Sequence, residues 1–267
     1  MSHQPRKRFG QHFLHDPAVI QRIIDAIAPG DGIAIVEIGP GRGALTVALL
    51  QRAGKLDVVE IDRDLAALLA QQCRGLGELH IHIGDALQFD YRRLHRGPIK
   101  IVGNLPYNIS TPLLFHLLAR IDCIHEMIFM MQKEIVDRIC AQPHTSNYGR
   151  LSVMVQSRCR TEKLMNIGPG AFTPAPRVNS SVIRLTPAGA SLSLITDARL
   201  FADVVLHAFN QRRKTLRNSL KDFLTSADFE RLGLAPTSRA ETLSVRDYIN
   251  ISNYLAAANP VVDNPVD

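Results

Sequence analysis

The chain has 267 residues, of which 46% are hydrophobic and 21% charged, proportions that exclude a disordered or fibrous protein. Its apolar stretches are far shorter than the roughly 20 residues of a transmembrane helix. The basic N-terminus MSHQPRKRFGQHF lacks the apolar core of a secretory signal, so we expect a cytoplasmic protein. A formal net charge of +6 favours a polyanionic partner, because a positive surface attracts phosphate backbones.

Segments with helical spacing of apolar residues alternate along the chain with short apolar runs. The predicted order is helix 18–27, strand 33–38, helix 44–53, strand 56–62 and helix 63–73. Further strand-like segments are LHIHIGDAL, PIKIVGNLPY, MIFMMQ, LSVMVQ and SSVIRL. We expect the last two to pair as an antiparallel edge. Alternating strands and helices predict an α/β fold with a doubly wound, mostly parallel sheet of about seven strands.

Residues 186–194 lose this periodicity and are rich in Pro, Gly and Ser, which indicates a linker. We therefore expect a catalytic domain over 1–190 and a small helical domain over 191–267. A helix over 203–224 is predicted to carry two faces. The apolar face holds Val205, Phe209, Leu216, Leu220 and Leu224, and the basic face holds Arg213, Arg217 and Lys221.

Basic residues are concentrated near both ends of the chain, and we expect them to bind an extended polyanion. They are Arg6, Lys7 and Arg8 near the start, and Arg212, Arg213, Lys214 and Arg217 near the end. The four cysteines are scattered, and neither they nor the ten histidines form a zinc-binding pattern. No catalytic metal is therefore expected.

The sequence E-I-G-P-G-R-G, residues 37–43, joins the first predicted strand to the next helix. Gly39 and Gly41 allow a sharp turn, and the helix N-terminus offers free N–H groups to an anion. That anion is either a dinucleotide pyrophosphate or the carboxylate of S-adenosylmethionine, and the pattern leaves both open. Glu60 lies at the end of the second predicted strand and Asp85 follows the third, where they can accept ribose hydroxyls and an adenine amino group.

Asn104, Leu105, Pro106 and Tyr107 end the following predicted strand. An exocyclic amine is a weak nucleophile because the ring shares its lone pair, so acceptors for its protons help to localise that pair. The side-chain oxygen of Asn104 and the carbonyl of Leu105 are suitable acceptors. Pro106 stiffens the loop, and Tyr107 can stack on an unstacked base. N-L-P-Y thus resembles the [NDS]-[IL]-P-[YFW] loop of amino-methyltransferases.

Other segments extend this resemblance over nearly the whole chain. They are K-R-F-G-Q-H-F-L (7–14), N-L-P-Y-N-I-S-T-P (104–112), Y-G-R-L-S-V (148–153), F-T-P-A-P-R-V (172–178) and F-N-Q-R-R-K-T-L-R-N-S-L (209–220). They resemble the KsgA family of small-subunit ribosomal RNA dimethyladenosine transferases. The resemblance implies a Rossmann-like class I methyltransferase with a helical RNA-binding domain. It also implies transfer from S-adenosylmethionine to two adjacent adenosines in a hairpin loop near the 3′ end of small-subunit rRNA.

Carried over by position, the resemblance implies a cofactor site of His12, Leu14, Gly39, Gly41, Glu60, Asp85 and Asn104. The family usually has Asn where this chain has His12, which keeps a hydrogen-bonding side chain but changes its shape and protonation. Phe172 is expected to form a second wall of the base pocket beside Tyr107, and the alternative is a core aromatic. We expect a monomer that acts within the assembling small subunit.

Two other functions fit parts of the pattern. A non-catalytic ribosome-assembly factor would keep the fold and the basic helix, but it would not need the intact loop from Asn104 to Tyr107. A DNA adenine methyltransferase would need that loop, but its loop more often begins with Asp. The basic residues between 209 and 221 argue against this second alternative.

Overall fold

The computed structural model describes residues 12–30, 32–189, 194–211 and 213–258. Arg6, Lys7, Arg8 and Arg212 of the expected RNA-binding set therefore lie outside the described residues. The chain divides into two compact units, one of residues 1–136 and 161–187 and the other of 137–160 and 188–267. The first unit ends close to the predicted boundary at residue 190, whereas 137–160 clusters with the second unit.

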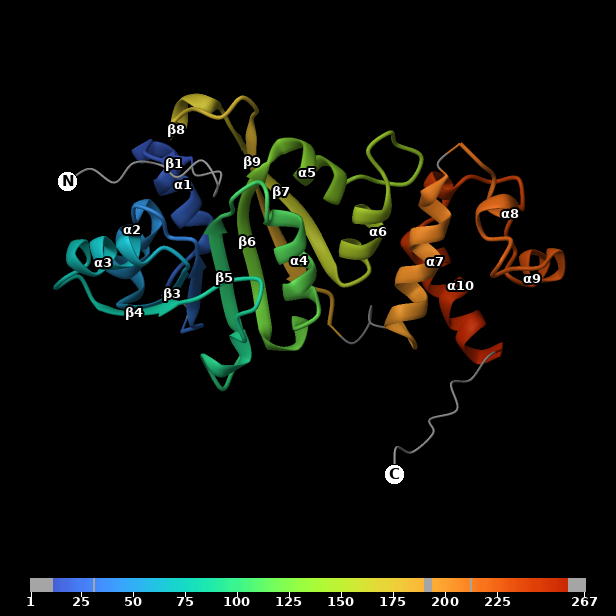
Figure 1. Cartoon of the computed structure of the whole chain (residues 1–267), viewed down its shortest axis with the longest axis horizontal. Coiled ribbons are helices and arrows are strands. Elements are labelled where there is room, and N and C mark those ends of the chain that lie inside the picture. Colours follow the sequence, from blue (N-terminus) through green and yellow to red (C-terminus); the bar gives the residue numbers. More distant parts are fainter. Residues whose placement is uncertain (1–11, 31, 190–193, 212, 259–267) are drawn as a thin grey trace. The chain divides into compact units, whose positions relative to one another are not determined.

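A seven-stranded sheet of order β4-β3-β2-β5-β6-β9-β7 forms the centre of the first unit (Figure 1). Its strands are β2 (Ile35–Ile38), β3 (Lys55–Glu60), β4 (Glu78–Ile83), β5 (Ile99–Asn104), β6 (Ile124–Gln132), β7 (Cys159–Ile167) and β9 (Ser180–Pro187). Strands β4, β3, β2, β5 and β6 run parallel, and β9 runs antiparallel to β6. The predicted α/β fold with a mostly parallel sheet is confirmed.

Five α-helices precede residue 140 in the described part of the chain, and the first three correspond to those predicted over 18–27, 44–53 and 63–73. They are α1 (Pro17–Ile27), α2 (Ala44–Ala53), α3 (Arg63–Gln72), α4 (Ser110–Leu118) and α5 (Lys133–Ile139), with short turns η2 (Tyr91–Arg93), η3 (Ile121–Cys123) and η4 (Pro169–Ala171). Asp16 begins α1 by accepting hydrogen bonds from the N–H groups of Ala18 and Val19 at 2.9 and 3.2 Å. No helix in the described part of the chain is long and apolar enough to cross a membrane.

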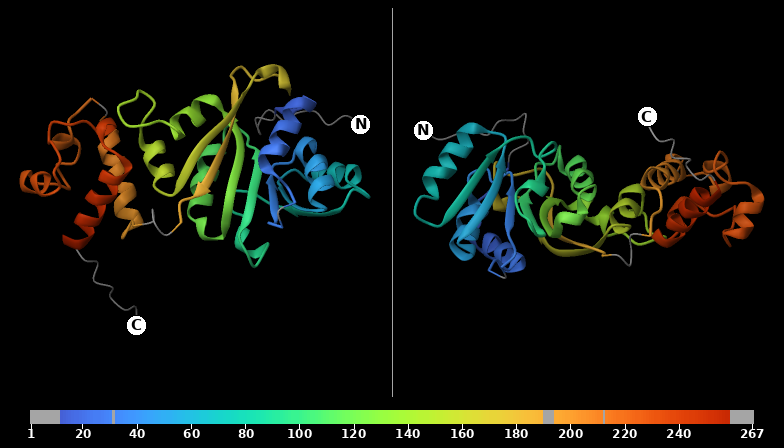
Figure 2. Two further views of the ribbon diagram at one scale, coloured as in Figure 1. Left: turned by 180° about the vertical axis from the view of Figure 1, so that it is seen from behind. Right: turned by 90° about the horizontal axis from the view of Figure 1, so that it is seen from below.

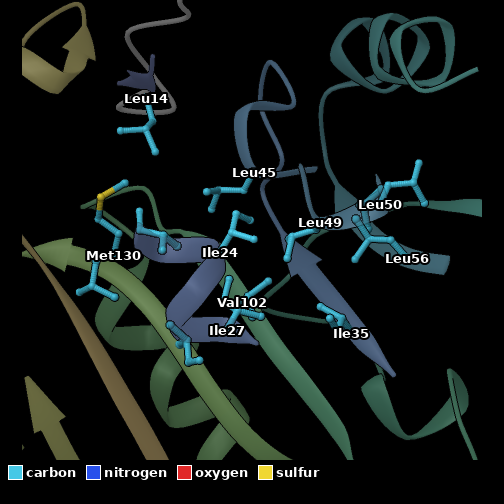
Figure 3. Packing of buried hydrophobic residues seen from close by; sticks show 14 of the residues in the cluster. Leu14, Ile24, Ile27, Ile35, Leu45, Leu49, Leu50, Leu56, Val102 and Met130 are labelled. Atoms are coloured by element: carbon cyan, nitrogen blue, oxygen red, sulfur yellow. The ribbon is translucent and has the colours of Figure 1, made fainter. Parts of the chain in front are cut away.

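Side chains from α1 and α2 share one hydrophobic cluster with the sheet (Figure 3), and Leu69 of α3 belongs to the same cluster. In β6, Ile128 and Met130 belong to this cluster. Met127 and Phe129, which alternate with them, are also fully buried and so face the opposite side, since neighbouring strand residues point to opposite faces. Figures 1 and 2 show α4 on that side. The sheet is therefore covered on both faces, as a parallel sheet requires.

The segment LSVMVQ, predicted as a strand, is the helix α6 (Arg150–Gln156), so that prediction is wrong. The amide of Gln156 donates to the carbonyls of Ile139 and Ala141, both at 2.8 Å. These tertiary contacts favour the helix over the strand preference of its two valines. The neighbour of β9 at the sheet edge is instead β7. Its sequence C-R-T-E-K-L-M-N-I is largely polar and lacks the apolar run by which the other strands were predicted.

The second unit is helical, as predicted, but its basic helix is interrupted. Its elements after residue 188 are α7 (Ala198–Asn210), α8 (Leu216–Ser219), α9 (Ser226–Arg231), η5 (Ala240–Thr242) and α10 (Val245–Ala258). The predicted continuous helix over 203–224 is wrong, because Thr215 is extended and pairs with Arg239. The expected apolar set does pack into the core of this unit, but the basic residues are not stacked on one helix.

Strands β2 and β5 approach closely at their carboxyl ends. A Cβ atom placed on Gly103 would overlap the carbonyl oxygen of Ile38. Gly39 follows Ile38 and Asn104 follows Gly103, so the two predicted functional loops begin side by side. Only glycine allows this approach without a backbone shift, because the obstructing atom belongs to the main chain.

Gly103→Ala should therefore lower the free energy of unfolding by about 1–3 kcal/mol, the usual cost of overpacking. Denaturant unfolding at constant pH measures the change. Gly97→Ala is the matched control, because Gly97 precedes the same strand and a Cβ there meets no atom within 4 Å. Equal stability of the two variants would contradict the proposed steric constraint.

Candidate functional site

A cavity of about 340 Å³ lies in the first unit at the carboxyl ends of β2, β3, β4 and β5, within the size range of small-molecule sites. Its walls come from residues 12–14 and from the loops that follow these strands. All the predicted cofactor residues line it, namely His12, Leu14, Gly39, Gly41, Glu60, Asp85 and Asn104. Leu105, Pro106 and Tyr107 line it too, so the structure brings four separate motifs together.

The glycine turn and the N-terminal strand close one side of this cavity. Gly39 and Gly41 have φ values of 64° and 56°, a conformation that side chains rarely adopt. A Cβ on Gly41 would lie 3.2 Å from the ring of Phe13, and the guanidinium of Arg42 lies 4.5 Å from the centre of that ring. Phe13 belongs to β1 (Phe13–Leu14), which pairs with β8 (Phe172–Thr173).

Glu60 is 5% exposed at the end of β3. Its carboxylate accepts hydrogen bonds from the N–H of Asp62 at 2.9 Å and of Gly41 at 3.4 Å. Burial raises the pKa of Glu60 against the opposing effect of these hydrogen bonds. Because a carboxylate has about four acceptor positions, Glu60 can hold the glycine turn in place and still accept hydroxyls from a ligand.

Glu37 and Ile61 also line the cavity, and our sequence analysis gave neither of them a role. Glu37 is 2% exposed and accepts a hydrogen bond from the hydroxyl of Thr46 at 2.6 Å. Burial, with a contribution from the nearby Glu60, raises its pKa to about 7. Ile61 is 51% exposed and offers an apolar surface beside Glu60. An acid at the end of an apolar strand was the available signal for Glu37, whereas Ile61 gave none.

Asn104 has a defined orientation. Its amide Nδ2 donates to the backbone carbonyl of His12 at 3.0 Å, which identifies the nitrogen because a carbonyl can only accept. The amide oxygen therefore points away from His12. The N–H of Leu105 donates to the carbonyl of Met130 at 3.0 Å, so β6 holds the start of the loop.

Tyr107 is held by contacts on two sides. Its hydroxyl is 2.8 Å from the hydroxyl of Ser180, which is 1% exposed at the start of β9. Its ring centre lies 5.5 Å from that of His12. The Nδ1 atom of His12 lies 2.7 Å from the carbonyl of Pro174, so this nitrogen carries the hydrogen.

Phe172 does not line this cavity. It is 3% exposed and packs in the cluster that includes Leu14 and Ala171, the surroundings of a core aromatic.

Arg213, Lys214 and Arg217 lie in the second unit and are exposed. Arg217 donates to the hydroxyl of Ser226 at 3.0 Å. Within the described ranges, no cluster of three or more His, Cys, Asp or Glu side chains suits a metal ion.

The raised pKa of Glu37 predicts a specific pH dependence. The folded protein holds the proton up to about pH 7, whereas the unfolded chain releases it near pH 4.3. Stability contributed by this group should therefore fall as pH rises between these values. Glu37→Gln cannot titrate, so its stability relative to the parent should increase from pH 4.5 to 8 by an amount on the order of 3 kcal/mol.

Denaturant unfolding at several pH values measures this difference. Glu230→Gln serves as the control, because it removes a carboxyl group of the same kind from an exposed residue of the second unit. A flat difference for Glu37→Gln would show that the Glu37 carboxyl ionises as in an unfolded chain.

Comparison with known proteins identifies the family. Residues 2–257 match the family model described as ribosomal RNA adenine dimethylase. A protein of Aromatoleum aromaticum named ribosomal RNA small subunit methyltransferase A is 54% identical, with 97% of each chain covered. A similarly named protein of Pseudomonas fluorescens is 49% identical and covers 95% of this chain and 94% of its own.

Among solved structures, a dimethyladenosine transferase of Plasmodium falciparum superposes with a TM-score of 0.78 at 26% identity, covering 92% of this chain and 98% of its own. The 23S rRNA methyltransferase ErmE shares the fold, with a TM-score of 0.70 at 23% identity over 91% of this chain and 99% of its own. The methyltransferase fold expected from the sequence is thus confirmed. The chain belongs to the ribosomal RNA adenine dimethylase family.

Proposed function

We propose that this protein transfers methyl groups from S-adenosylmethionine to N6 of two adjacent adenosines in the 3′-terminal hairpin loop of small-subunit rRNA. The relatives named as small-subunit methyltransferases cover almost the whole chain. The orientation of Asn104 is the structural observation that carries the proposal. With Nδ2 bonded to His12, its oxygen is available as an acceptor, which is what an amine substrate needs.

The chemistry of the cavity suits S-adenosylmethionine. The turn at Gly39 and Gly41 would receive its amino-acid part, Glu60 its ribose hydroxyls, and Asp85 its adenine amino group. Asp85 Oδ1 accepts from the N–H of Leu87 at 2.9 Å, which leaves Oδ2 for that contact. Glu37 and Glu60 are buried acids that would attract a positively charged ligand in their ionised forms, and a cation beside them would oppose the rise in pKa that burial causes.

S-adenosylmethionine would supply the methyl group, which is bonded to its sulfonium sulfur. The rest of the molecule is the leaving group, a neutral thioether. The protein must orient the adenine amine and accept hydrogen bonds from its N–H groups. Methylation makes the nitrogen cationic, and its proton is then released to water. Asn104 Oδ1 and the Leu105 carbonyl are the proposed acceptors, and the ring of Tyr107 is the proposed stacking surface. The same π face stabilises the positive charge that develops on the methylated nitrogen. A second transfer requires the same groups to accept a monomethylated amine.

Asn104 also bears on the alternative of a DNA adenine methyltransferase, whose loop more often begins with Asp. Aspartate has no hydrogen to donate to the His12 carbonyl, and its charge would lie against that oxygen. The contact seen here therefore suits Asn and not Asp. A non-catalytic assembly factor would not need an oriented Asn104. Calorimetry with S-adenosylmethionine distinguishes that alternative, because the assembly factor would not bind it.

Exposed cations of the second unit are the proposed contacts to the RNA backbone. Arg213, Lys214 and Arg217 surround the bridge between Thr215 and Arg239, and the basic N-terminal residues and Arg212 are proposed to act with them. We propose a monomer that acts in the cytoplasm on the assembling small subunit. Labelled methyl transfer onto unmodified small subunits, with the modified base identified by mass, tests the substrate directly.

Asn104→Ala should separate RNA binding from catalysis. Losing one oriented transition-state acceptor typically reduces the rate by about 10²–10³, whereas RNA affinity depends mainly on Lys and Arg. Single-turnover methylation and a binding assay measure the two effects. Thermal unfolding near that of the parent excludes a folding defect. A rate within a few-fold of the parent would remove Asn104 from the catalytic role.

Neutralising Arg213 and Lys214 together should weaken RNA binding and reduce the slope of log affinity against log salt by about 1.4–1.8 if both contact phosphates. Cofactor affinity should stay constant. Arg52→Gln with Lys55→Gln is the matched control, because it removes the same charge from residues of the first unit that pair with Asp25 and Glu78. Equal slopes for the two double variants would exclude a specific phosphate contact.

A further inference from the structure

Tyr91 lies directly behind one wall of the cavity without lining it. It begins the short turn η2 and is 1% exposed. Its hydroxyl donates to the carbonyl of Ala86 at 3.1 Å. Ala86 lines the cavity and follows Asp85. The hydrogen bond fixes the Ala86–Leu87 peptide unit, whose N–H donates at 2.9 Å to Oδ1 of Asp85, the acid proposed to recognise adenine.

The same loop is fixed at a second point. The Nε2 atom of His116 is 2.9 Å from the carbonyl of Phe89, and Arg120 donates to His116 Nδ1 at 3.2 Å. This arrangement places the hydrogen of the neutral imidazole on Nε2. The ring of Tyr91 packs edge-on against both Phe89 and His116, with ring centres 5.1 and 6.0 Å apart.

His116 also connects this loop to the proposed catalytic loop. It lies on α4, and Ser110 at the start of α4 donates to the carbonyl of Tyr107 at 3.2 Å. Burial, together with the nearby carboxylate of Asp85, raises the pKa of Tyr91. The Tyr91 hydroxyl therefore keeps its proton and remains a donor over the pH range of interest.

We propose that Tyr91 is a positioning residue that directs the Asp85 carboxylate toward the exocyclic amino group of the cofactor's adenine, and so determines selectivity for an adenine base. This inference rests on the proposed function, which assigns Asp85 to adenine. Without the Tyr91 hydroxyl, the carbonyl of the Ala86–Leu87 peptide loses this hydrogen bond, and the N–H of the same peptide, which bonds Asp85 Oδ1, is less firmly held. The expected defect is therefore specific to ligands that carry the amino group.

Calorimetry with S-adenosylhomocysteine and S-inosylhomocysteine tests the proposal, because inosine has a carbonyl in place of that amino group. For the parent protein, adenosyl binding should be tighter than inosyl binding, and equal affinities would overturn the assignment of Asp85 itself. Tyr91→Phe removes only the hydroxyl. It should weaken adenosyl binding by about three- to tenfold, the effect of one hydrogen bond, and leave inosyl binding unchanged.

Tyr248→Phe is the matched control, because the Tyr248 hydroxyl is also buried and donates to a backbone carbonyl, that of Ala240, at 2.7 Å in the second unit. This variant should lower thermal stability without affecting either ligand. In an Asp85→Ala background, Tyr91→Phe should cause no further loss of adenosyl binding. An equal loss for both ligands, or no loss for either, would overturn the positioning role even if the parent prefers adenine.

Discussion

The close approach of β2 and β5 at Gly103 is the constraint on which the rest of the site depends. The glycine turn leaves β2 and the N-L-P-Y loop leaves β5, and these strands are neighbours in the sheet. A side chain at residue 103 would meet the main chain of Ile38 and push the two loops apart. The proposed cofactor and base sites must share one cavity, because the reacting nitrogen and the methyl carbon must come within about 3–3.5 Å of each other.

The cavity also has acidic side chains buried in its wall, and their charge affects which ligands it binds. Two acids, Glu37 and Glu60, lie almost fully buried at its wall, and Glu60 raises the cost of ionising Glu37. A sulfonium ligand would stabilise their ionised forms, and the thioether product would not. If the proposed function holds, the transfer would remove part of this attraction and would favour exchange of product for a new methyl donor before the second methylation.

Sequence patterns predicted the parts of this molecule that depend on local chemistry. Alternating apolar runs and capping residues such as Asp16 located the parallel strands and the first helices, and the polar residues at strand ends located the cavity. Patterns failed where a distant contact decides the local structure. Residues 150–156 form a helix that is held by hydrogen bonds of Gln156. The helix predicted over 203–224 is interrupted at Thr215, because Thr215 pairs with Arg239. Tyr91 gave no sequence signal, since its role depends on a carbonyl brought near by the fold.

The structure also explains how His12 can stand where the family usually has Asn. The contact that orients Asn104 uses the backbone carbonyl of residue 12, which every amino acid provides. The side chain is therefore free to vary as long as it fits beside Tyr107. Histidine fits because Nδ1 donates to Pro174 and the imidazole packs against the tyrosine ring. His12 thus contacts Asn104 through its main chain, and its imidazole adds an aromatic neighbour to the proposed base-stacking surface of Tyr107.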